Sequence, residues 1–130
     1  SAASDVYKRQ IVGPLLGLSP SESTSAADGR GVMVVVSLAS YLLLAPLVEE
    51  IVFRRLLMGY LDRSVPAFAS VILSSLLFGL VHIAPPVMVY ATFLGMGCAL
   101  VTRFHNSLRA GFIVHLVNNV VVQLIAVSAL

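Results

Sequence analysis

The sequence predicts an all-α integral membrane protein with about four transmembrane helices. Hydrophobic residues make up 58% of the chain and charged residues only 11%, whereas soluble domains have roughly 45–50% and about 25%. The mean hydropathy of +0.98 points in the same direction. No stretch keeps a regular alternation of polar and apolar residues, so the membrane spans are expected to be helices.

Four apolar segments supply the predicted helices, and each is near the roughly 20 residues that a helix needs to cross a bilayer. Pro66 suits the start of the second helix, and Pro85 with Pro86 interrupts the chain between the second and the third. A short link containing histidine, asparagine and serine separates the third from the fourth. The segments cover residues 32–61, 65–82, 87–104 and 108–130.

The first 30 residues differ in composition from this apolar part. Residues 1–10 read SAASDVYKRQ, which resembles translated adaptor sequence, and we expect a non-native leader here. Residues 11–30 combine a short apolar piece with serine, glycine, alanine and proline, which is typical of a partial helix followed by a flexible linker. Residues 31–130 are expected to form the core of the protein, with flanking helices missing.

Arginines predict the orientation of the helices. They gather in or beside the first and third links, whereas the opposite side has only Arg30. The positive-inside rule therefore places the two arginine-rich links in the cytoplasm. The net charge of +2 is small and the basic residues are scattered, so no nucleic-acid partner is expected. The arginines of these links are Arg54, Arg55, Arg63, Arg103 and Arg109.

An ionisable patch interrupts the first apolar segment. No charged residue lies from Gly31 to Val48, and Glu49, Glu50 and Arg54 follow. An unpaired ion in apolar surroundings costs several kcal/mol, so a partner or a function is expected. On a helix, Glu50 and Arg54 lie four residues apart and can form an ion pair. Glu49 points about 100° away from Glu50 and has no cation nearby along the helix. We therefore expect Glu50 to be structural and Glu49 to be available for chemistry.

Two further sets of polar residues lie in the apolar segments. The second segment ends with Phe78 and His82, one helical turn apart, and the fourth contains His115 and Asn119 at the same spacing. Each alone has a structural explanation, such as an amide that bridges two helices. Together with Glu49, they supply a carboxylate and a histidine that can act as base and acid on water. The second histidine and the amide can stabilise an oxyanion, a set typical of amide-bond hydrolysis.

Three motifs resemble, in order and spacing, the signature of the type II CAAX prenyl endopeptidase family. This family is also called the CPBP group, for CAAX protease and bacteriocin processing, and includes the Abi immunity-type proteins. Each motif lies on its own apolar segment, and the resemblance covers about residues 31–130. The motifs are Glu49-Glu50-x-x-x-Arg54, Phe78-x-x-x-His82 and His115-x-x-x-Asn119.

The resemblance implies a role for each matching residue. Glu49 is expected to activate a water molecule with assistance from His82, and His115 with Asn119 is expected to stabilise the oxyanion. The ion pair of Glu50 with the arginine four residues later is expected to support the helix and to orient Glu49.

The implied activity is that of an intramembrane endopeptidase, which cleaves a peptide bond near the end of a membrane-associated substrate. In the eukaryotic branch of the family the substrate is a prenylated C-terminal tail. Bacteria generally lack that substrate, so a bacterial member would act on another membrane-associated peptide or protein, such as a bacteriocin-related one. We expect the plasma membrane of a bacterium as the location, the lipid bilayer as a partner, and no cofactor.

The sequence leaves three alternatives open. Glu49, His82 and His115 could bind zinc, with water as a fourth ligand, although the sequence has no His-Glu-x-x-His motif. The single cysteine, Cys98, excludes a disulfide within the chain and a cysteine-based metal cluster.

The chain could also be a non-catalytic bacteriocin self-immunity protein that keeps the polar residues as a scaffold. Thirdly, it could be a transporter fragment whose acidic and histidine residues line an ion path.

Overall fold

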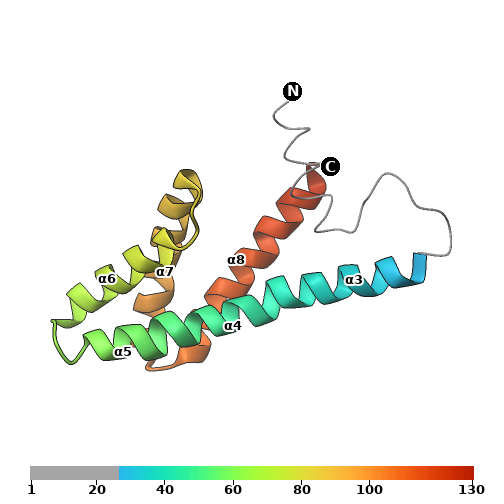
Figure 1. Ribbon diagram of the computed structural model, residues 1–130. Helices are drawn as coiled ribbons and strands as arrows, with labels where there is room; N and C mark the ends of the chain where they lie inside the picture. Colours follow the sequence, from blue (N-terminus) through green and yellow to red (C-terminus); the bar gives the residue numbers. More distant parts are fainter. Residues whose placement is uncertain (1–26) are drawn as a thin grey trace. The chain divides into compact units, whose positions relative to one another are not determined.

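The computed structural model describes residues 27–130, and every regular element in this part of the chain is a helix (Figure 1). The predicted all-α class is confirmed. The interpretations of residues 1–10 and of most of 11–30 fall outside the described residues. The described chain divides into two compact units, one made of residues 27–44 with Asn119–Leu130 and the other of Ala45–Asn118.

The first helical stretch contains two π-helical segments. The segment η2 (Ser40–Leu44) lies just before Pro46, whose ring removes a backbone donor and crowds the preceding turn. A wider turn at this point relieves that crowding. The segment η3 (Ile51–Leu57) begins directly after Glu50, and π-helical turns are frequent at functional sites. The α-helical parts of the stretch are α3 (Ala27–Ala39), α4 (Ala45–Glu50) and α5 (Met58–Leu61).

The other three helices have ends that the sequence explains. Pro66 directly precedes the first of them, and Pro85 is the first residue of the second, where its missing N–H costs no helical hydrogen bond. The second helix ends at His105, and the next residue, Asn106, has a φ of 48° in the left-handed region that commonly ends helices. The three helices are α6 (Ala67–Leu80), α7 (Pro85–His105) and α8 (Leu108–Ser128).

The chain is an integral membrane protein. Among the described residues, three helices are long and apolar enough to cross a membrane, namely Gly29–Leu61, Pro85–His105 and Leu108–Ser128. The predicted second span corresponds to α6, which has only 14 residues. At 1.5 Å per residue, α6 is about 21 Å long, which is less than the roughly 30 Å of a hydrocarbon core. The structure therefore combines three spans with one shorter apolar helix.

In the unit Ala45–Asn118, α6 and α7 lie side by side with small residues between them (Figure 1). Gly95 and Ala99 of α7 stand four residues apart, a spacing of small residues that is typical of close helix packing, and both are buried. The leucines of α6 face outward instead, as expected where the surroundings are lipid, whereas Val71 and Phe78 of the same helix are buried. Small buried residues of the two helices include Ser70, Ser74, Ser75, Gly79, Ala91, Gly95, Cys98 and Ala99.

Gly79 lies where α6 approaches α7 closely. A Cβ at this position would lie 1.9 Å from Thr92 Oγ1 and 2.6 Å from the backbone oxygen of Met88. Because a backbone atom is in the way, we expect Gly79→Ala to push the helices apart and to lower the free energy of unfolding by about 1–3 kcal/mol. Thermal unfolding of the detergent-solubilised protein measures this. A matched control is Gly97→Ala on α7, where a Cβ would have nothing within 4 Å; equal losses in the two variants would contradict this packing.

The other unit pairs residues 27–44 with the end of α8. The side-chain amide of Asn119 donates a hydrogen bond to the backbone oxygen of Tyr41 over 3.3 Å. A hollow of about 260 Å³ lies beside this contact, with Leu38, Leu42 and Gln123 among its lining residues. Gln123 is buried, and its side-chain nitrogen has no hydrogen-bond partner among the described residues.

Candidate active site

The predicted ion pair is present and completely buried. Arg54 Nε lies 3.4 Å from Glu50 Oε2, and neither side chain has any exposed surface. Both residues belong to the same continuous helical stretch, four positions apart. The other carboxylate oxygen, Oε1, lies 3.0 Å from Nδ1 of His115 on α8. Glu50 therefore connects the first helical stretch to α8 within the unit Ala45–Asn118.

His115 lies between the two adjacent glutamates. Its Nδ1 contacts Glu50, and its Nε2 lies 3.5 Å from Oε2 of Glu49. The three side chains differ in accessibility, because Glu49 keeps 32% of its side chain exposed while His115 keeps 4% and Glu50 none. One carboxylate can therefore be reached from outside, whereas the other is sealed into the helix packing.

Phe78 on α6 is fully buried against the charged groups. Its ring packs edge-on to that of His115, with centroids 5.5 Å apart. The centroid of the His82 ring lies 5.0 Å from that of Phe78. The guanidinium carbon of Arg54 lies 4.9 Å from the centroid of the same ring, within the range of a cation–π contact. The ring of Phe53, four residues after Glu49, packs edge-on to that of Phe78, with centroids 5.1 Å apart. A single aromatic ring thus separates His82 from His115 and covers one face of the arginine.

His82 lies at the end of α6, in a backbone turn with unusual geometry. Its Nδ1 lies 2.8 Å from the backbone oxygen of Phe78. A carbonyl oxygen can only accept, so this nitrogen carries the hydrogen, and in the neutral ring Nε2 keeps its lone pair. The next residue, Ile83, has a φ of 65°, which is a strained conformation for a β-branched side chain. The turn therefore holds His82 at the helix end with a basic nitrogen available.

The two asparagines of α8 have different partners. Asn118 accepts a hydrogen bond from the hydroxyl of Tyr90 on α7. Asn119, the residue that matches the motif, donates to Tyr41 in the other unit described above. Sequence reasoning did not single out Tyr90, because a tyrosine in an apolar helix gives no signal until its partner is known.

A second cluster of potential metal ligands shares His115. Three buried residues each place one possible ligand atom within 4.8 Å of the other two, namely Glu50, Cys98 and His115. This set differs from the predicted alternative zinc ligands, with which it has only His115 in common. Zinc needs four ligands, and the carboxylate of Glu50 already pairs with Arg54.

The fold and the site together define a class of protein, namely a membrane-embedded helical protein with a partly exposed carboxylate beside a buried histidine. A protein-family model described as type II CAAX prenyl endopeptidase Rce1-like matches residues 31–121. The match spans more than half of the chain, and the chain belongs to this family. No curated protein and no solved structure matches it.

Proposed function

We propose that this protein is an intramembrane endopeptidase in which Glu49 activates the attacking water. The observation that carries the proposal is the difference between two neighbouring glutamates. Glu50 is sealed and paired with Arg54, whereas Glu49 is partly exposed and its carboxylate lies beside His115. A general base has to be reachable by water and substrate, and only Glu49 of the two meets this condition.

The proposal places a hydrogen between Glu49 and His115. Nδ1 of His115 donates to the carboxylate of Glu50, so a neutral ring would direct the lone pair of Nε2 at the carboxylate of Glu49. A hydrogen shared along this 3.5 Å contact removes the repulsion. With that hydrogen on nitrogen, the charges of Glu49, Glu50, Arg54 and His115 sum to zero.

This arrangement suits each step of peptide hydrolysis. Glu49 takes a proton from water as the water oxygen attacks the carbonyl carbon of the substrate. The N–H of His115 then has a new acceptor in the oxyanion, and Asn119 at the next turn of α8 is proposed as the second donor. Glu49 returns its proton to the leaving nitrogen when the carbon–nitrogen bond breaks. His82, with Nε2 as an acceptor, is proposed to hold the water.

The substrate is proposed to be a membrane-associated peptide or protein, cleaved near its end. Members that act on prenylated C-terminal tails define the eukaryotic branch of the family, and bacterial members would need another membrane-associated substrate. The plasma membrane of a bacterium is the proposed location, with the arginine-rich links in the cytoplasm. No cofactor is needed for the proposed steps, because carboxylate and imidazole supply both proton transfer and oxyanion stabilisation.

The experiment that tests this proposal is a cleavage assay on a farnesylated CAAX peptide, with the detergent-solubilised chain and with or without a strong zinc chelator. We expect cleavage to continue in the chelator and to disappear in Glu49→Ala and His82→Ala. Cleavage that is lost on chelation and restored by zinc would instead assign metal ligands. If neither the farnesylated nor the unmodified peptide is cleaved, while the chain protects cells from a bacteriocin, the self-immunity alternative is favoured.

A further inference from the structure

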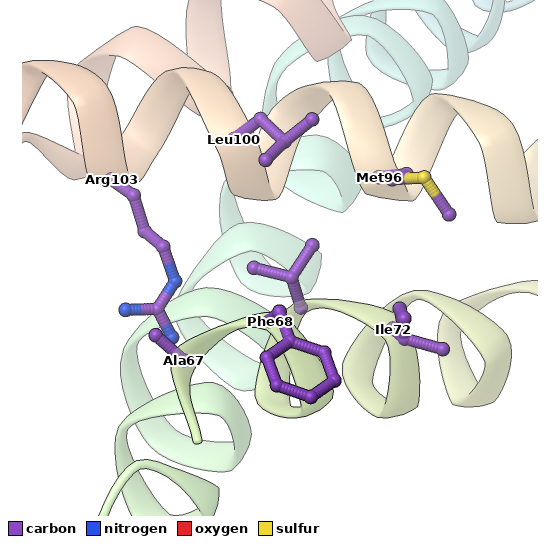
Figure 2. A pocket seen from close by; sticks show the side chains of 7 residues that line it. Ala67, Phe68, Ile72, Met96, Leu100 and Arg103 are labelled. Atoms are coloured by element: carbon purple, nitrogen blue, oxygen red, sulfur yellow. The ribbon is translucent and has the colours of Figure 1, made fainter.

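An apolar hollow of about 310 Å³ lies between α6 and α7, away from the glutamates and histidines (Figure 2). Its lining is entirely apolar except for one arginine at one end. The labelled residues of Figure 2 show an order along the two helices, from the arginine inward. They are Arg103 and Ala67 at one end, Leu100 and Phe68 in the middle, and Met96 and Ile72 at the other end.

The hollow is elongated along the membrane-spanning direction of α7. From Arg103 to Met96 it follows seven residues of this helix, which is about 10 Å. Because α7 is a candidate span and Arg103 lies in its last turn, the arginine end is at the boundary between hydrocarbon and water. The apolar end lies deeper in the hydrocarbon region. A cavity of this orientation follows the path of a lipid acyl chain.

Arg103 is anchored, but its donors are not all used. One terminal nitrogen contacts Asp62 and lies 3.2 Å from the hydroxyl of Ser70. Nε is buried without a hydrogen-bond partner among the described residues. Burial raises the pKa of Asp62, but hydrogen bonds from Ser70 and Arg103 and the arginine charge outweigh it and hold the pKa below its usual 3.8. Asp62 is therefore ionised at neutral pH and orients the guanidinium at the mouth of the hollow.

The links and helix ends that adjoin Asp62 and Arg103 along the sequence carry more basic than acidic residues. Asp62 is the only acidic residue in the links 62–66 and 106–107 and the helix ends beside them, whereas Arg63, Arg103 and Arg109 are basic. Arg63 and Arg109 are both exposed. Arginine binds phosphate through several hydrogen bonds at once, and basic residues near a membrane surface attract anionic lipids by about 1 kcal/mol each.

We propose that this hollow binds an anionic phospholipid, with an acyl chain between α6 and α7 and the headgroup phosphate at Arg103. The apolar lining gives a free inorganic anion no contact beyond the arginine. The apolar lining suits an acyl chain and the charge of Arg103 suits a phosphate, and a phospholipid has both. Selection between lipids rests on headgroup charge, because the acyl chains of anionic and zwitterionic phospholipids are the same. Binding of this lipid does not depend on the proposed peptidase activity.

The test is native mass spectrometry of the full, detergent-solubilised chain, titrated with phosphatidylglycerol or with phosphatidylcholine of the same chains. We expect the wild type to retain phosphatidylglycerol more strongly, and Arg103→Gln to lose about fivefold in affinity for it, the equivalent of about 1 kcal/mol. Binding of phosphatidylcholine should stay unchanged. Arg55→Gln removes an exposed arginine from another helix and should leave the binding of both lipids unchanged.

A second variant keeps the test decisive if Arg103→Gln does not fold. Ala67 is exposed at the mouth of the hollow, so Ala67→Phe should fill the hollow and weaken retention of both lipids without removing any charge. Glycerophosphate, which has the phosphate but no chain, should not compete. Equal retention of the two lipids by the wild type, unchanged binding in Ala67→Phe, or competition by glycerophosphate would each overturn the proposal.

Discussion

Glu49→Gln is expected to lower the rate of peptide cleavage by about 10²–10⁴-fold, the usual contribution of a positioned general base. The amide keeps the shape of the side chain but cannot take the proton from water. Cleavage of a farnesylated CAAX peptide under single-turnover conditions measures the effect. The loss should appear in the rate of the chemical step and not in substrate affinity, because the groups proposed to contact the substrate stay the same.

Stability gives the control for this variant. Glu49 is partly exposed, so its replacement by glutamine should leave the thermal unfolding of the protein nearly unchanged. A folded Glu49→Gln protein that cleaves at the wild-type rate would assign the base to another residue. A variant that is inactive only because it has unfolded would be recognised by its unfolding temperature.

Arg54→Gln is expected to destabilise the protein by about 3–5 kcal/mol, since it leaves the carboxylate of Glu50 buried without its cation. Arg54 and Glu50 have fully buried side chains 3.4 Å apart, so water cannot replace the lost partner. The free energy of unfolding, measured by thermal or denaturant unfolding in detergent, reports the loss. The neighbouring Arg55→Gln is the matched control, because Arg55 is exposed and surface changes usually stay within about 0.5 kcal/mol.

The double variant Glu50→Gln with Arg54→Gln separates the ion pair from the packing. If the cost of the single change comes from an unpaired charge, removal of both charges should recover a large part of the lost stability. A double variant as unstable as the sum of the two single variants would show that the residues act independently. That result would contradict the structural role assigned to the pair.

Local features of the fold could be read from the sequence because neighbouring residues determine them. The helix start at Ala67 follows from Pro66, and the ion pair of Glu50 with Arg54 follows from the four-residue spacing. The predicted break at Pro85 and Pro86 lies just before them, because Pro85 is the first residue of α7. The small residues Gly95 and Ala99 indicated where α7 packs closely. In each case the signal and the structure lie within one or two helical turns.

The contact between His115 and the two glutamates could not be predicted in the same way. Glu50 and His115 lie 65 positions apart, and the packing of the two helices between them, α6 and α7, decides whether they meet. The structure shows the contact, along with π-helical segments in the first helical stretch and an α6 of only 14 residues.

Phe78 shows a further limit of the sequence. Its spacing from His82 could be read from the sequence. Its contacts with Arg54 and His115 could not, because the three residues lie on three different helical stretches. An aromatic residue in an apolar helix is typical of ordinary packing, so nothing in its neighbourhood indicated that it lies between two histidines. The contact of Asn118 with Tyr90 was hidden for the same reason.

The outward-facing apolar side chains of α6 have a consequence for the temperature dependence of stability. Serines and glycine are buried on this helix, while its leucines are exposed. If helices separate within a bilayer, the newly uncovered surface meets lipid and little apolar surface is transferred to water. A large heat capacity of unfolding comes from the hydration of apolar groups. The free energy of helix separation should therefore change almost linearly with temperature, without the pronounced curvature that soluble domains show.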